Sequence, residues 1–566
     1  MSPVAKRARL EEPETNLDKP QPSEVPSATT VVIPVTTETH KADQEIGKVV
    51  EEKSLDDNIN GDISSEDEAE EVYREDASDQ KARTDLYLDT INREMLDFDF
   101  EKLCSVSLSN NNVYCCLVDG KYFQGRGKNS WAYKHSVNEG KHVFLKLDTE
   151  EFFILPDGYK VSDPSLEDII KVLAPRYTHP QISRLSYLPS SPSYDLSARP
   201  YLPGYIGLNN IKANDYENVI IHSLLHVPPL RDFFLAPDNK LLQPESKPTE
   251  LVKKFAELAR KVWNPDLFKA QVSPHELLQE VSVASEGKFK VTKQGDPIEF
   301  LGWLLNRLHK DLGGSRKKNS SIIYKTFQGD LKIETQQYMV KADSGGSKRP
   351  QFDIGRETTT ATPPFLFLAL DLPRPPLFQD SVEKNIIPQV SLASILAKYD
   401  GNTTQEFGDQ LKRHKLTRLP PYLILHTKRF TKNNFVEDKN PTIVNFPLRG
   451  VDMHDYVEPL PAAPHSTVYD LLINIPYESS SASTTTKVGS ATATNPKKKQ
   501  QLADGLDNPR WKVHLRAGGG GGDGEKWFSI EDLRVDEVQR EMVFLGETVL
   551  QIWQRRDLGP NGAGLV

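Results

Sequence analysis

The pattern of apolar and polar positions divides most of the chain into a helical stretch followed by a strand-rich stretch. Apolar residues recur at helical spacing over residues 250–263 and 299–312, which predicts two amphipathic helices. Short apolar runs bounded by turn-forming residues then predict strands at 363–372, 420–430, 466–477, 510–517, 526–535 and 548–556. Helices first and an antiparallel sheet later indicate an α+β fold and argue against alternating βαβ units.

A smaller unit precedes this large one. Residues 112–127 predict a strand, a turn and a second short strand, and residues 142–161 predict two strands with turn signals around Asp148 and Gly158. The expected organisation is an acidic tail, a small α+β domain, a connector, a large domain with an inserted disordered loop, and a short C-terminal tail. The expected boundaries are 1–82, 83–176, 177–200, 201–557 (with the loop at 478–505) and 558–566.

Composition adds a disordered terminus to this picture. Residues 1–82 are rich in Pro, Glu, Ser and Thr and poor in aromatic residues, so they bury too little apolar surface to order. A short basic cluster of Lys6, Arg7 and Arg9 fits either a nuclear import signal or a chance grouping in a tail.

Charge and cysteine content exclude several classes of protein. The net charge of −10 argues against a protein that coats bare nucleic acid. The sequence contains no run of 18 apolar residues, so it predicts no membrane span. Only three cysteines occur, Cys104, Cys115 and Cys116, which is too few for a disulfide framework and fits a reducing compartment.

Residues 207–235 begin with a turn, Gly-Leu-Asn-Asn, and continue into an amphipathic helix. The start of this helix carries Asp215, where chemistry would be expected of an enzyme. Together with 293–309, 419–430, 445–448 and 526–535, this stretch resembles the ubiquitin-specific proteases. The resemblance implies a papain-like fold of thumb, palm and fingers, which in that family carries a Cys-His-Asp/Asn triad for cleaving ubiquitin isopeptide bonds.

The resemblance also implies that the triad is degenerate. Asp215 stands where the family has its nucleophilic cysteine, and Arg510 stands where it has the histidine base. Asp532 matches the orienting carboxylate and Asn210 the oxyanion-hole asparagine. An orienter and an oxyanion donor without nucleophile or base cannot carry out the reaction. His514 is expected too far along its strand to replace the base, and Asp215 and Arg510 are expected either to form an ion pair or to face water.

The small domain resembles the ubiquitin-protease-type zinc finger through residues 102–108, 116–127, 131–136 and 142–147. Its zinc ligands are eroded, because Ser107, Asp119 and Trp131 stand where the family has cysteine or histidine. A structural zinc needs four converging groups, so zinc binding is doubtful. Asp85 and Asp119 remain as oxygen ligands, and the candidate metal ligands that survive are Cys104, Cys116, His135 and His142.

Longer stretches, including 87–114, 261–279 and 429–447, resemble the catalytically inactive, splicing-associated members of this family more than its active proteases. This resemblance implies a nuclear, non-catalytic pre-mRNA splicing factor that stabilises the spliceosomal tri-snRNP through protein contacts, with small nuclear RNA touched at most indirectly. The alternatives are an inactive receptor for ubiquitin or a ubiquitin-like protein, and an active isopeptidase. Lys121, in place of an arginine that clamps the ubiquitin tail, argues against ubiquitin binding.

Overall fold

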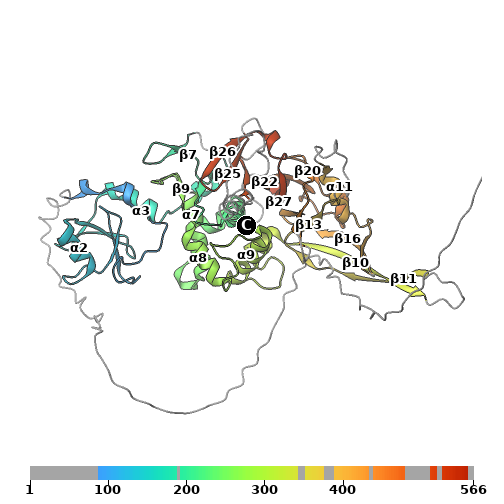
Figure 1. The fold of residues 1–566 in the computed structure, drawn as a ribbon, viewed down its shortest axis with the longest axis horizontal. Coiled ribbons are helices and arrows are strands. Elements are labelled where there is room, and N and C mark those ends of the chain that lie inside the picture. Colours follow the sequence, from blue (N-terminus) through green and yellow to red (C-terminus); the bar gives the residue numbers. More distant parts are fainter. Residues whose placement is uncertain are drawn as a thin grey trace, which may run out of the picture.

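The computed structural model describes eight stretches of the chain (Figure 1). The acidic tail, the inserted loop and the C-terminal tail expected from the sequence lie outside these stretches, except for Glu478 and Leu558 at their edges, and so do the basic cluster at Lys6 and the candidate ligand Asp85. Within the described stretches, no helix is both long and apolar enough to cross a membrane. The described residues are 87–187, 191–341, 351–374, 388–408, 410–432, 437–478, 510–518 and 525–558.

The small domain is built on a five-stranded antiparallel sheet in the order β2-β1-β3-β4-β5. Helix α2 (Trp131–Glu139) is capped by the Ser130 side chain, and α3 (Glu167–Leu173) closes the domain. The stretch 142–161 holds three strands and not the expected two, because each of its two turn signals joins a pair of strands. The strands are β1 (Val113–Cys116), β2 (Tyr122–Gln124), β3 (Val143–Lys146), β4 (Glu151–Ile154) and β5 (Tyr159–Val161).

A helical layer follows a connecting segment that contains α4 (His179–Arg184), β6 (Ser193–Tyr194) and β7 (Pro200–Tyr201). Both helices predicted from periodicity are confirmed, as α7 and α9, and α5 begins at Asp215. Every residue of α5 is buried, so this helix lies in the centre of the large domain. The helices are α5 (Asp215–Leu225), α6 (Pro228–Leu235), α7 (Glu250–Val262), α8 (His275–Ala284), α9 (Pro297–Asp311) and α10 (Ile322–Phe327).

A nine-stranded sheet forms the other half of the large domain, with the central order β13-β17-β27-β22-β24-β25-β26. Each of the six predicted stretches contains strand, but 363–372, 510–517 and 526–535 each hold parts of two strands where one was expected. β13 and β17 also run parallel, so the sheet is mixed. The strands are β12 (Pro364–Phe365, in a separate sheet), β13 (Leu368–Asp371), β17 (Tyr422–Lys428), β21 (Val451–Asp452), β22 (Val468–Glu478), β23 (Arg510–Trp511), β24 (Val513–Ala517), β25 (Lys526–Glu531), β26 (Arg534–Val538) and β27 (Glu547–Arg555). Together with the helices, they confirm the α+β class.

A separate sheet in the order β11-β10-β16-β15 extends from the large domain (Figure 1). In that view the small domain lies at one end of the molecule, the helices in the middle, and the β10–β11 hairpin projects at the opposite end. Its strands are β10 (Gly329–Lys341), β11 (Gln351–Ala361), β15 (Gln405–Phe407) and β16 (Gln410–Arg418). Short elements of this region include β14 (Gln389–Ser391), α11 (Leu392–Leu396) and β20 (Ile443–Asn445). A further short strand, β18 (Phe430–Lys432), pairs with β19 (Glu437–Lys439).

A buried ion pair ties the small domain to the helices. Lys261, near the end of α7, donates to the Phe98 carbonyl at 2.6 Å and to the Asp99 carboxylate at 2.9 Å. The other oxygen of Asp99 accepts the Ser273 amide at 2.8 Å. Phe268 belongs to the apolar cluster of the small domain, so apolar packing accompanies the ion pair. The two domains therefore meet through a specific, desolvated contact.

We expect Lys261→Met to lower the free energy of unfolding by about 3 kcal/mol, because it leaves Asp99 without its cation in a site where the Lys261 side chain is only 9% exposed. Lys269→Met is the matched control, because its pair with Asp97 is about half exposed and should contribute under about 1 kcal/mol. Urea denaturation followed by fluorescence measures both, and equal effects of the two substitutions would contradict the assignment.

Candidate functional site

The start of α5 is held against a turn of the sheet by a close backbone approach. β8 (Gly207–Leu208) runs beside the turn that joins β25 to β26, and the Leu208 amide donates to the Asp532 carbonyl at 3.0 Å. A Cβ on Gly207 would lie 2.6 Å from the Cα of Leu533, so only glycine fits there. Asp532 has φ of 50°, a left-handed conformation that aspartate tolerates in two-residue hairpins. This contact brings Asp532 to the segment that leads into α5.

Asp215 is the first residue of α5, and only 8% of its surface is exposed. Its Oδ1 accepts the Gln294 side-chain amide at 2.8 Å. Burial raises the pKa of Asp215, and it outweighs the hydrogen bonds from Gln294 and from the backbone amides of Tyr216 and Trp511. The Asp215 carboxylate therefore accepts hydrogen bonds from uncharged donors. It lies at the first residue of the helix, the position from which a nucleophile on this helix would act.

Asp532 is the centre of an amide network on the other side of the helix start. Its two oxygens accept the side-chain amides of Asn210, at 2.9 Å, and Asn218, at 3.3 Å. The Asn210 oxygen accepts the Asn214 backbone amide at 3.3 Å, so both ends of this side chain are engaged. Burial also raises the pKa of Asp532, against the hydrogen bonds from the two asparagines. The structure thus brings together Asn210 and Asp532 beside Asp215, three of the four residues expected at the site.

Arg510 does not join them. The ion pair with Asp215 is wrong, and of the alternative that both side chains face water only the Arg510 half holds, because Asp215 is buried. The Arg510 guanidinium lies 3.5 Å from Glu531 on the neighbouring part of the sheet, and its side chain is 65% exposed. Glu531 contacts Arg510 at the surface of the sheet, whereas an ion pair with Asp215 would require the arginine side chain to be buried. Within the described part of the chain, Asp215 pairs with Gln294, a residue that the sequence analysis did not single out.

His514 is enclosed in the sheet. It pairs in register with Asn474 on one side and Ser529 on the other, and burial lowers its pKa to about 4. A histidine with so low a pKa is neutral at physiological pH, but it is a weak base. Its place in the sheet agrees with the expectation that it does not substitute for a base at the start of α5.

The side chains at the start of α5 limit the chemistry available there. A thiolate nucleophile requires sulfur, and no cysteine follows Cys116 in the sequence. The cluster at the start of α5 instead holds two carboxylates that accept hydrogen bonds from amides. Such an arrangement holds the start of α5 against the β25–β26 turn through side-chain hydrogen bonds.

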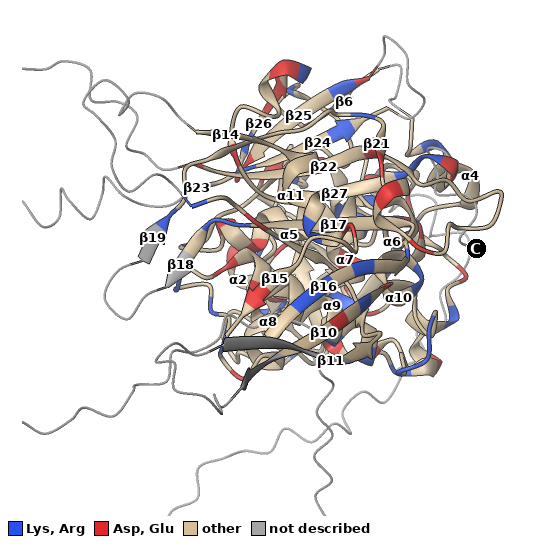
Figure 2. Cartoon of the chain, turned by 90° about the vertical axis from the view of Figure 1, so that its right-hand side faces the viewer, with Lys and Arg blue, Asp and Glu red and all other residues tan. Residues whose placement is uncertain are grey.

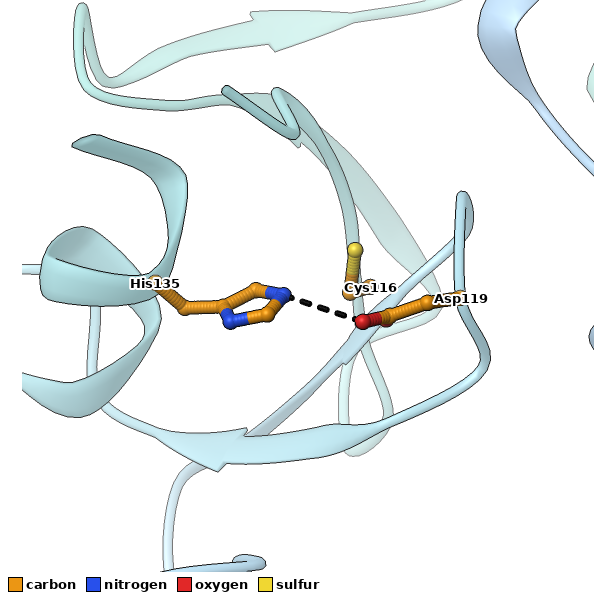
Figure 3. A group of neighbouring side chains, drawn as sticks. All are labelled: Cys116, Asp119 and His135. Atoms are coloured by element: carbon orange, nitrogen blue, oxygen red, sulfur yellow. Dashed lines mark ion pairs between the residues drawn. The ribbon is translucent and has the colours of Figure 1, made fainter. Parts of the chain in front are cut away.

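A second cluster lies in the small domain (Figure 3). Cys116 at the end of β1, Asp119 in the following turn and His135 on α2 offer ligand atoms that all lie within 4.8 Å of one another. His135 Nε2 is 3.2 Å from Asp119 Oδ2, and its ring stacks on Phe123. Burial raises the pKa of the Cys116 thiol to about 12 and lowers the pKa of His135, so that both are neutral near pH 7.

The structure divides the four candidate metal ligands. Cys116 and His135 lie together, whereas Cys104 lies apart and accepts the Ser107 amide at 3.4 Å. The Nδ1 of His142 lies 2.8 Å from the Leu155 carbonyl, and its ring packs on Tyr87. The neighbouring Lys141 reaches the cluster instead, with its Nζ 2.9 Å from Asp119 Oδ2. Lys141 was not expected at this cluster, because it precedes β3 (Val143–Lys146) and lies outside the alternation of that strand.

Comparison with known proteins assigns both domains. A family model described as ubiquitin carboxyl-terminal hydrolase matches residues 206–552, and one described as a zinc finger in ubiquitin hydrolases and other proteins matches residues 104–166. "Ubiquitin carboxyl-terminal hydrolase 39" of Homo sapiens is 46% identical, over 86% of this chain and 82% of its own length. "Probable mRNA-splicing protein ubp10" of Schizosaccharomyces pombe is 44% identical, over 83% of this chain and 88% of its own length.

A solved structure agrees with these relatives. The crystal structure of "an essential yeast splicing factor" superposes with a TM-score of 0.61 at 28% identity, and the match covers 83% of this chain and 99% of that one. The similarity therefore extends over both domains.

The buried histidine next to the site predicts a pH dependence. Because the pKa of His514 falls from about 6.5 unfolded to about 4 folded, the unfolded chain binds one more proton between these values, and stability falls as the pH is lowered. We expect the free energy of unfolding of His514→Phe, measured relative to the wild type, to rise by about 1.4 kcal/mol per pH unit from 6.5 down to about 4. Urea titrations across this range measure it, and a difference that is independent of pH would contradict the burial of a neutral His514.

Proposed function

This chain belongs to the ubiquitin carboxyl-terminal hydrolase family, and its papain-like domain follows a zinc-finger domain of the ubiquitin-hydrolase type. On that premise we propose that it is a non-catalytic pre-mRNA splicing factor. The observation that carries the proposal is the carboxylate of Asp215, held by Gln294, at the position from which the family's cysteine acts. Relatives described as splicing proteins support the same process.

The residues at the triad positions explain why the proposed protein is not catalytic. Asp215 replaces the nucleophile, and Arg510, which stays protonated, replaces the base. The Asn210 amide is directed at Asp532 and not at an oxyanion. A second carboxylate in the cleft would oppose the negative charge that develops on a substrate carbonyl. The hydrolase-like domain therefore serves as a scaffold.

The proposed assembly is the spliceosomal tri-snRNP, which the protein stabilises in the nucleus through contacts with particle proteins. Figure 2 shows that Lys and Arg positions are interspersed with Asp and Glu positions along the cartoon of the chain. Because the chain has a net charge of −10, we propose that RNA contacts contribute little to this assembly.

We expect neither the wild type nor Asp215→Cys to release fluorophore from a ubiquitin–fluorophore amide, because the introduced thiol has no base at Arg510 to activate it. Turnover measured continuously at micromolar protein tests this. Asp215→Ala is the control. Turnover by the wild type that Asp215→Ala abolishes would establish an isopeptidase, and robust cleavage by Asp215→Cys would overturn the assignment of position 510.

We expect tagged protein recovered from nuclear extract at moderate salt to bring with it the U4, U6 and U5 RNAs together, as measured by small-RNA sequencing against untagged extract. Asp215→Asn should recover the same RNAs, because the proposal gives this carboxylate no catalytic part. Recovery of ubiquitylated proteins without these RNAs would instead support a ubiquitin receptor.

A further inference from the structure

The finger cluster of Cys116, Asp119 and His135 contains three of the four groups that a tetrahedral zinc site needs. A further group that reaches it is an ammonium, since Lys141 Nζ lies 2.9 Å from Asp119 Oδ2 and Lys121 Nζ lies 3.8 Å from the same oxygen. A protonated lysine has no lone pair to give a metal, and its charge repels a divalent cation. The donor set therefore does not fit the zinc ion that this type of finger implies.

Hydrogen bonding in the cluster converges on a carboxylate. Asp119 Oδ2 accepts the Lys141 ammonium, and the carboxylate also accepts the Cys116 thiol and the Lys121 backbone amide, the latter at 3.3 Å. The Asp119 side chain is only 13% exposed, so these donors take the place of water around it. A zinc site has the opposite arrangement, in which deprotonated donors surround a cation.

The cluster also connects the same parts of the domain that a metal would connect. Cys116 ends β1, Asp119 lies in the β1–β2 turn, His135 is on α2, and Lys141 precedes β3. The side chains of Asp119 and His135 are 13% and 10% exposed, and His135 Nε2 lies 3.2 Å from Asp119 Oδ2. The Nε2 of His135 makes no hydrogen bond, which leaves the Asp119–Lys141 pair as the main polar link.

We propose that the small domain is a metal-free finger, in which the Lys141 ammonium replaces the zinc ion as the cation that holds Asp119 and the segments around it. The cross-link between β1, its turn and the start of β3 is then a salt bridge made within the chain. The folded state of this domain does not depend on zinc.

The zinc content of the full chain tests this directly. Wild type purified from cells grown with added zinc should contain under about 0.1 zinc per chain by mass spectrometry, and excess EDTA should leave its melting temperature unchanged. Asp119→Cys/Lys141→His supplies two cysteines and two histidines and should take up about one zinc per chain. About one zinc in the wild type, with a fall in melting temperature on chelation, would overturn the proposal.

Two single variants keep the proposal testable if the double variant does not fold. Lys141→Met removes the cation and should lower the melting temperature by several degrees, roughly 4 °C or more, with no recovery on adding zinc. Lys121→Met is the matched control, since that side chain is 59% exposed and should change the melting temperature by under about 1 °C. Wild-type stability of Lys141→Met, or its recovery with zinc, would show that Lys141 does not replace the metal.

Discussion

The removal of the Asp215 and Asp532 carboxylates from water at the start of a single buried helix constrains the architecture around it. An ionised group in such a place is tolerated only when hydrogen-bond donors surround it. Asp532 recruits Asn210 and Asn218, and Asp215 recruits Gln294 from the segment before α9. These bonds join the helix, the sheet turn and the α8–α9 connection into one unit. They also engage the side-chain amide of Asn210, the residue that matches the family's oxyanion donor.

The sequence predicts the elements of this fold well, because each carries its own local signal. The apolar stripes of α7 and α9, and the strand patterns from 363 onward, correspond closely to the observed elements. The start of α5 at Asp215 agrees with the resemblance to the protease family, whereas the bond from Asn210 to Asp532 was not expected from it. Local propensity and family pattern together therefore locate most of the site.

Partner choice is the part that could not be predicted. Arg510 pairs with Glu531 because the two approach each other at the surface of the sheet, a neighbour relation that depends on strand register. Gln294 and Lys141 reach their carboxylates from loops and strand starts, where sequence gives no direction for the side chain. Ion pairs and hydrogen bonds between distant segments depend on tertiary geometry, so a charge pattern alone gave Asp215 the wrong partner.

The position of the three cysteines has a consequence for redox chemistry. All three are buried in the small domain, and the sequence after Cys116 contains none. Peroxide and electrophilic probes act on accessible thiolates. The large domain therefore contains no thiol for them to modify, and covalent ubiquitin probes that trap an active-site thiol would not label it. Oxidative stress, which inactivates thiol-dependent hydrolases, leaves its large domain chemically unchanged at this position.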